Sequence, residues 1–262
     1  MSLRGRTALI TGVSRVDGIG AAVARRLAAM GADLVLHHHR PHDTDQPWGA
    51  DDLDRVLDSI RPHLTGGATL TDLPGDLAAP GAPEALVREA GPLDVLVCNH
   101  ARSGGDGTLA DITLDELDGH WATDARSVLL LTKAFAAQHE PARPGGRVIW
   151  MTSGQQQGPM PGEVAYGAAK AALAGITPTV ADELADQGIV LNTVNPGPVN
   201  TGFLSPGMGI DDATLDSLRE RFPGKRFGTP DDPARLIAWL VSDDGEWVVG
   251  QVLNTEGGFR RG

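Results

Sequence analysis

Short apolar runs alternate with longer helical patterns along most of the chain. The runs are rich in Val, Ile and Leu and predict strands over 7–11, 34–36, 93–98, 147–151, 189–194 and 248–254. The intervening patterns predict helices over 21–30, 51–61, 113–139, 165–186 and 231–242. Strands that alternate with helices predict an α/β fold with a doubly wound parallel sheet and helices on both faces.

The chain has 262 residues, a length that one α/β domain can fill, so we expect a single domain over 1–262. Two segments interrupt the alternation. Residues 40–50 are rich in Pro, Asp and Gln and lengthen the connection after the second strand. Residues 203–222 lie between the last strands, close to where a ligand is expected, and we interpret them as a substrate lid.

A glycine-rich turn separates the first predicted strand from the first helix. Gly12, Gly18 and Gly20 allow backbone to approach a pyrophosphate, which then meets the free N–H groups of the helix. Ser14, Arg15 and Ile19 complete this turn. Glycine turns are common, but one placed between strand and helix predicts a Rossmann-type dinucleotide site.

The end of the second strand bears on the choice of cofactor. An acidic residue there binds the ribose of NAD, whereas basic groups accommodate the 2′-phosphate of NADP. This chain has three histidines followed by Arg40, and Arg15 offers a second guanidinium, so NADP(H) is favoured and NAD(H) stays possible. His37 and His39 share a strand face, but without further clustered ligands we predict no metal site.

Composition and charge exclude several partners. Lys and Arg number 22 against 34 Asp and Glu, and the net charge of −12 disfavours nucleic acid and anionic membrane surfaces. No apolar run approaches the ~18 residues of a membrane span. Cys98 is the only cysteine, and the first residues lack the apolar core of a signal peptide, which together predict a cytoplasmic protein.

The candidate chemistry lies on the predicted helix 165–186 and the strand before it. Tyr166, the only tyrosine, and Lys170 are four residues apart, which puts phenol and ammonium on one helix face. The ammonium is expected to lower the pKa of the phenol toward neutral pH. Ser153 follows a strand and can hydrogen-bond a substrate oxygen at the same point. Such a pair can be an ordinary surface contact, but the three residues together predict carbonyl chemistry.

At this point the sequence resembles the short-chain dehydrogenase/reductase family over essentially its whole length. The resemblance rests on TGVSRVDGIG, Asp76-Leu77, Cys98-Asn99-His100-Ala101, Ser153, Tyr166-x-x-x-Lys170, Asn195-Pro196-Gly197 with Thr201, and the glycines near the C-terminus. The members that it resembles most are 3-oxoacyl-acyl-carrier-protein reductases.

The resemblance implies a role for each matching residue. Tyr166 would protonate the carbonyl oxygen, Ser153 would hold that oxygen, and Lys170 would tune Tyr166 and bind the nicotinamide ribose. Hydride would pass between nicotinamide and the substrate carbon. The implied cofactor contacts also include Asp76 at the adenine, Asn99 beside the cofactor, Thr201 at the carboxamide, and Leu77, Pro196, Gly197 and Val199.

Two departures from the family pattern concern the site. Five residues separate Gly12 from Gly18 where three are usual, so the phosphate turn carries an insertion. Asp124 stands where the fourth catalytic residue is normally asparagine. If this carboxylate faces Lys170 through water, it favours the lysine cation and weakens the support for a Tyr166 phenolate. We expect Asp124→Asn to preserve or raise turnover.

Three functions remain open. The first is NADP(H)-dependent reduction of a carbonyl, including a 3-oxoacyl thioester on an acyl carrier protein. The basic residues that could dock the carrier are Arg102 and the group Arg219, Arg221, Lys225 and Arg226. The second is a dehydrogenase or ketoreductase of a small metabolite, polyol or sugar, and the third is a sensor that binds NADP(H) without turnover. The resemblance also implies a homotetramer or homodimer.

Overall fold

The computed structural model describes residues 1–140, 143, 145–208 and 210–261. The strands are β1 (Thr7–Ile10), β2 (Asp33–His38), β3 (Leu70–Pro74), β4 (Val95–Cys98), β5 (Arg147–Met151), β6 (Val190–Asn195) and β7 (Val252–Asn254). The α-helices are α1 (Ile19–Ala29), α2 (Arg40–Thr44), α3 (Leu53–Ile60), α4 (Ala82–Ala90), α5 (Leu114–His120), α6 (Ser127–Gln138), α7 (Val164–Ala185), α8 (Asp212–Glu220) and α9 (Asp231–Leu240). Short 3-10 turns lie at 61–63, 154–156 and 243–245.

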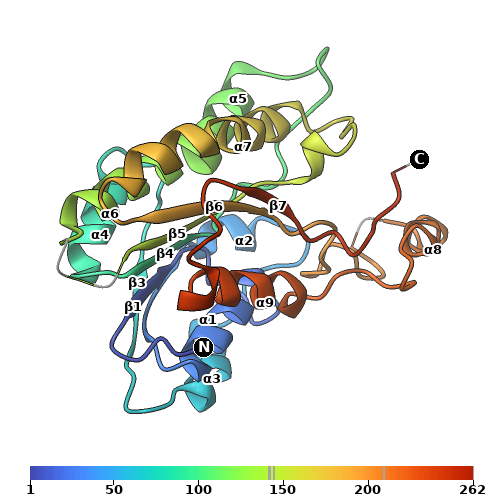
Figure 1. The fold of residues 1–262 in the computed structure, drawn as a ribbon. Coiled ribbons are helices and arrows are strands. Elements are labelled where there is room, and N and C mark those ends of the chain that lie inside the picture. Colours follow the sequence, from blue (N-terminus) through green and yellow to red (C-terminus); the bar gives the residue numbers. More distant parts are fainter. Residues whose placement is uncertain (141–142, 144, 209, 262) are drawn as a thin grey trace.

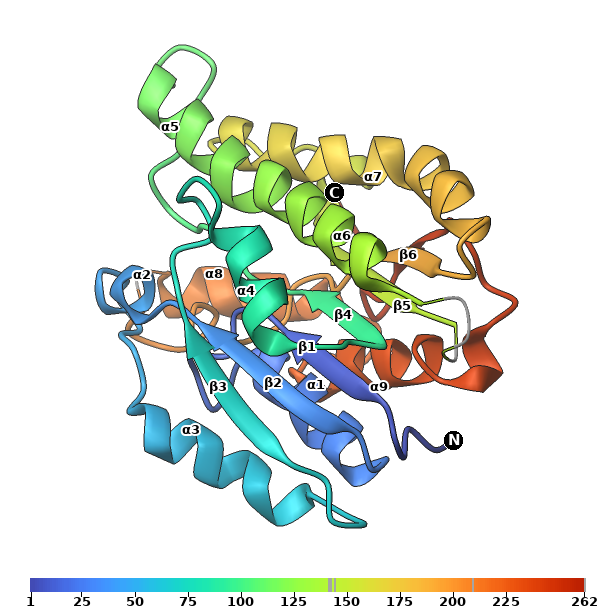
Figure 2. The same cartoon turned by 90° about the vertical axis from the view of Figure 1, so that its left-hand side faces the viewer.

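All described strand pairs are parallel, in the order β3-β2-β1-β4-β5-β6-β7. The order reverses between β1 and β4, which is the switch point at which doubly wound sheets bind ligands. Helices α4, α6 and α7 cover one face of the sheet, and α1, α3 and α9 cover the other (Figures 1 and 2). The predicted doubly wound α/β fold is confirmed.

Each face of the sheet has its own apolar core. Leu36, Val97 and Ile237 belong to the layer under α1 and α9, while Leu96, Trp150 and Leu131 belong to the layer under α4 and α6. A third, smaller cluster includes Leu215 and Phe222 and lies at α8, inside the segment 203–222.

Strand β3 and helix α4 were not predicted. The residues of β3 are Leu70-Thr71-Asp72-Leu73-Pro74, and its alternation is weak because β3 is an edge strand with partly exposed side chains. Proline fits there because an edge strand has free backbone positions. Residues 40–50, expected to lengthen the connection after the second strand, begin with the short helix α2.

The predicted helix 113–139 has three parts. Thr113 and Glu116 form a capping box that starts α5. A wide π-helical turn, η2 (Trp121–Arg126), then joins α5 to α6. Such turns occur often at functional sites, and this one carries Asp124.

In the part of the chain that the structure describes, no helix is both long and apolar enough to cross a membrane.

Candidate active site

A cleft of about 670 Å³ opens along the carboxyl edge of the sheet. It is lined by residues that directly follow β1, β2, β3, β4, β5 and β6, so it spans the switch point between β1 and β4. The predicted residues that line it are Gly12, Ser14, Arg15, Gly18, Ile19, His39, Asp76, Leu77, Asn99, Tyr166, Lys170, Pro196 and Thr201. The fold therefore brings most of the predicted site residues to one cavity.

Close backbone packing explains the glycines of the turn. Gly12 has φ +72°, and a Cβ there would lie 2.7 Å from the Cα of His100. A Cβ on Gly20 would lie 2.8 Å from both the Gly12 oxygen and Asn99 Nδ2. Asn99 Nδ2 donates to the carbonyl oxygens of Thr11 and Gly12 at 3.1 Å each. Asn99 thus ties the turn after β4 to the turn after β1.

Arg15 lines the cleft beside the glycine turn and lies on an aromatic surface. Its guanidinium is 5.6 Å from the centre of the Trp48 ring, and Trp48 packs edge-to-face against Phe203. Asp43 accepts a hydrogen bond from Ser14. Burial lowers the pKa of Arg15 from its ordinary value, and nearby Asp43 and Asp51 oppose this effect. The insertion 40–50 therefore shapes the environment of the predicted phosphate contact.

Four of the predicted cofactor contacts do not line the cleft, and one of them is Gly20, described above. Arg40 is exposed at the start of α2. Gly197 has φ +70°, and a Cβ there would lie 2.7 Å from the Cα of Glu256, so this glycine permits close packing of two turns. Val199 forms an isolated bridge with Gly228. In this structure the last two hold backbone in place beside the cleft.

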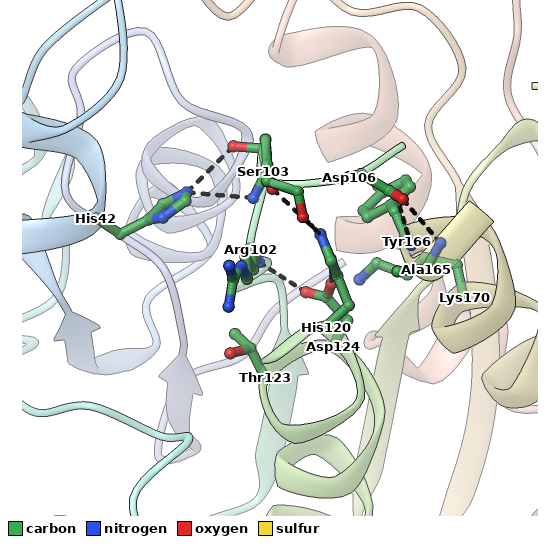
Figure 3. A network of polar contacts seen from close by, with 12 residues as sticks. His42, Arg102, Ser103, Asp106, His120, Thr123, Asp124, Ala165, Tyr166 and Lys170 are labelled. Carbon is green, nitrogen blue, oxygen red and sulfur yellow. Dashed lines mark hydrogen bonds and ion pairs between the residues drawn. The ribbon is translucent and has the colours of Figure 1, made fainter. Parts of the chain in front are cut away.

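Tyr166, Lys170 and Ser153 converge from α7 and the end of β5 (Figure 3 shows the first two). Tyr166 is half-buried, and Ser153 lies near enough for its hydroxyl to lower the pKa of the phenol. Lys170 is 2% exposed, and its Nζ donates to the Met151 oxygen at 3.2 Å and lies 5.7 Å from the centre of the Tyr166 ring. The predicted trio is therefore spatially compact.

The structure reverses the expected direction of the Tyr166 pKa shift. Burial raises the pKa of Tyr166 well above its ordinary value, the charge of Asp124 raises it further, and the Ser153 hydrogen bond lowers it. Burial also lowers the pKa of Lys170, against the charge of Asp124. Desolvation outweighs the predicted influence of the ammonium, so Tyr166 holds its proton at neutral pH.

Asp124 is fully buried and its two oxygens have different partners. Oδ1 accepts a hydrogen bond from the backbone N–H of Arg102 at 2.7 Å, and Oδ2 contacts His120 Nδ1 at 2.8 Å. The sequence suggested a carboxylate directed at Lys170 through water. The structure instead pairs the carboxylate with a histidine one helical turn earlier (Figure 3).

The sequence interpretation missed several polar residues at the site. Buried His100 contacts Thr11 Oγ1 and Ser127 Oγ, each at 2.7 Å. Asp106 accepts hydrogen bonds from the backbone N–H groups of Ala165 and Tyr166 and so fixes the start of α7. These contacts join residues far apart in the sequence, and only the spacing of His120 and Asp124, one helical turn, offered a signal.

Cys98 and the strand-end histidines have structural surroundings. Cys98 is 1% exposed, and burial raises the pKa of its thiol, as expected of a small apolar residue. His37 Nε2 contacts the Gly75 oxygen at 3.0 Å. Within the described residues there is no group of three or more His, Cys, Asp or Glu side chains placed to hold a metal.

A crevice at the switch point, lined by a phenol and an ammonium with the Ser153 hydroxyl near the phenol, is typical of an NAD(P)-dependent oxidoreductase. Comparison with known proteins agrees with this class. A family model described as enoyl-(acyl carrier protein) reductase matches residues 12–260. The chain belongs to the short-chain dehydrogenase/reductase family.

Individual relatives cover almost the whole chain. An uncharacterized oxidoreductase of Bacillus subtilis, YjdA, is 38% identical over 98% of both chains. Human dehydrogenase/reductase SDR family member 4 is 31% identical over 98% of this chain and 88% of its own length. A short-chain dehydrogenase of Burkholderia cenocepacia, solved in complex with NADP, is 33% identical with a TM-score of 0.82, covering 98% of this chain and 99% of its own.

Proposed function

We propose that the protein is an NADP(H)-dependent reductase of small carbonyl compounds. The observation that carries this proposal is the position of Tyr166 in the lining of the cleft, near Ser153 and beside buried Lys170. A nicotinamide supplies the hydride. A phenol with a raised pKa keeps its proton at neutral pH, which is the state that carbonyl reduction needs.

The proton steps follow from the side chains. Ser153 Oγ–H donates to the carbonyl oxygen and polarises it. Tyr166 then gives its proton to that oxygen as negative charge develops there. Lys170, whose Nζ donates to the Met151 oxygen, would bind the nicotinamide ribose and stabilise the phenolate that remains.

The surroundings of Arg15 support NADP(H) over NAD(H). Arg15 is aligned on Trp48 at the adenosine end, where a planar guanidinium can bind a phosphate in a bidentate way. His39 lines the same end of the cleft. A relative that is 33% identical was solved with NADP, which agrees with this preference.

The charge pattern near α8 favours small substrates over an acyl carrier protein. In the basic group proposed for carrier docking, Arg219 pairs with Asp216, Lys225 pairs with Glu220, and Arg226 pairs with Asp232. Positive charges already paired on an exposed surface contribute little to long-range attraction. A 3-oxoacyl thioester is therefore the second candidate, proposed on the family resemblance.

Two further parts of the interpretation remain proposals. The first is the substrate lid over residues 203–222, of which residue 209 lies outside the described residues. This segment includes α8, which packs on its own apolar cluster, as a lid requires.

The second is the homo-oligomer. Helix α5 exposes Leu114 and Leu117, and exposed Trp121 follows them, so we propose this face as a subunit contact. Sedimentation of a stable monomer would contradict the oligomer.

The first test mixes the protein with NADPH and ethyl acetoacetate, and separately with acetoacetyl-coenzyme A, and follows loss of the reduced nicotinamide. NADH runs in parallel. We expect NADPH consumption that Tyr166→Phe lowers at least about 10²-fold, the lower end for an acid–base residue, with unchanged NADPH binding. Binding of NADPH without turnover of any carbonyl, unaffected by Tyr166→Phe, would favour the sensor.

A further inference from the structure

His120 is the last residue of α5 and lies against the catalytic residues without being exposed. Its side chain and that of Asp124 are both 0% exposed, and the two form an i, i+4 pair across the π-helical turn. Its ring also packs edge-to-face on Tyr166, with the ring centres 6.0 Å apart. A titratable group thus lies between the carboxylate at the asparagine position and the proposed acid.

The partners of His120 determine its protonation. Nδ1 faces Asp124 Oδ2 at 2.8 Å, and Nε2 faces the carbonyl oxygens of Gly104 and Gly105 at 3.2 and 3.3 Å. A backbone carbonyl and an ionised carboxylate can only accept. Both ring nitrogens must therefore donate, and a histidine that donates from both nitrogens is the imidazolium cation.

We infer that His120 is a positioning residue, a permanent imidazolium that holds the Asp124 carboxylate on the Arg102 N–H and neutralises its charge beside Tyr166 and Lys170. The effect of His120 on catalysis rests on the proposed function. The charge state of His120 does not depend on the proposed function. The His120–Asp124 pair then carries no net charge, like the neutral asparagine that is usual at position 124.

Other charged groups around His120 agree with a cation. Asp106, on the loop before α5, and Asp124 both raise the pKa of His120, against burial and the charge of Arg102, and the net direction is above the ordinary value. Glu163, at the start of α7, also interacts with His120. Tyr166 is neutral at physiological pH, and the Lys170 Nζ, which donates to the Met151 oxygen, lies 5.7 Å from the centre of the Tyr166 ring.

Removing either partner has a different consequence. In Asp124→Asn, the amide oxygen can accept from Arg102 N–H while its NH₂ donates to Nδ1 of a neutral His120 that keeps its Nε2–H on the Gly104 and Gly105 oxygens. Every hydrogen bond survives and both charges vanish. In His120→Gln, the Asp124 anion stays buried without its counter-charge, which is the costly arrangement.

The charge state can be measured without turnover. In protein labelled with ¹⁵N-histidine, the ring signals of His120 are assigned by their loss in His120→Gln. At pH 8, where an ordinary histidine with a pKa near 6.5 is almost wholly neutral, we expect both His120 nitrogens to carry protons. A neutral tautomer of His120 at this pH would overturn the inference.

The effect on catalysis is tested by a double-mutant cycle. The reaction is oxidation of ethyl 3-hydroxybutanoate with NADP⁺, because this direction requires the Tyr166 phenolate. In the pH profile of kcat/KM, the apparent pKa of the acidic limb should rise by about one pH unit in His120→Gln. At pH values below this apparent pKa, kcat/KM should therefore be about tenfold lower than in wild type. Adding Asp124→Asn to His120→Gln should restore the limb to within about threefold of Asp124→Asn alone. Exposed His63→Gln is the matched control.

The outcomes separate the two claims. A wild-type protein that turns over no carbonyl or alcohol contradicts the proposed function, and the nitrogen signals still decide the charge state. If the wild type turns over substrate and His120 is an imidazolium, but the pH profile of kcat/KM is unchanged in His120→Gln, the positioning role is overturned. Thermal melting of the four proteins identifies unfolding, and a recovered limb in the double variant shows that the loss in His120→Gln comes from the uncompensated charge.

Discussion

Acidification is expected to destabilise the protein through His37, which supports the glycine turn from the end of β2. This side chain is 1% exposed, its Nδ1 accepts from the Gly12 N–H at 3.4 Å, and its Nε2 contacts the Gly75 oxygen. Burial lowers the pKa of His37 to about 4. The folded protein therefore keeps this ring neutral at pH values where an unfolded chain protonates it.

The sign and size of the effect follow from proton linkage. Between pH 6.5 and 4 the unfolded state binds the extra proton, so the free energy of unfolding rises with pH in this window and is lost as pH falls. The whole shift corresponds to about 3 kcal/mol, and the part between pH 7 and pH 5 to about 2 kcal/mol. Because the side chain is buried, solvent screening reduces this little.

The assay is urea unfolding at pH 7, 6 and 5 at one protein concentration, for wild type and His37→Gln. Glutamine cannot titrate, so we expect the free energy of unfolding of the variant to fall by about 2 kcal/mol less than that of wild type over this range. His63→Gln, at an exposed position, should leave the wild-type pH dependence unchanged. Parallel pH dependences in wild type and His37→Gln would refute the reasoning.

Two further predictions concern the nucleotide turn. Arg15→Gln should weaken NADPH binding by about 1–3 kcal/mol, the usual value of a charge-assisted contact, and leave NADH binding nearly unchanged. Fluorescence titration with both nucleotides measures these affinities. Equal losses for NADPH and NADH would contradict a 2′-phosphate contact. Gly20→Ala places a Cβ 2.8 Å from the Gly12 oxygen and should cost about 1–3 kcal/mol in urea unfolding, whereas Gly175→Ala, with open space around it, should be neutral or stabilising.

The sequence predicts the architecture well because strand and helix periods differ. Parallel strands buried on both faces, such as β4 and β5, are continuous apolar runs and were found near their observed bounds. Strand β3 was missed since an edge strand needs less apolar surface. The last strand was predicted too long, because Val248 and Val249 lie in an irregular segment before β7 and do not pair with β6 as a strand.

The site shows a similar division. Tyr166, Lys170 and Ser153 could be predicted because a helical spacing and a strand end place them. The direction of the Tyr166 pKa shift could not, since it depends on burial, which the local sequence does not contain. The partner of Asp124 lay four residues away, but only the positions of the Gly104 and Gly105 oxygens reveal that His120 is charged.

The two segments that interrupt the strand and helix alternation meet each other at Trp48 and Phe203, whose ring centres are 6.0 Å apart. Trp48 also carries the guanidinium of Arg15. If Arg15 binds a dinucleotide phosphate as proposed, that phosphate is connected through Trp48 to the first residues of the segment 203–222. In kinetic terms, this connection favours an ordered mechanism in which the dinucleotide enters first and the carbonyl compound second.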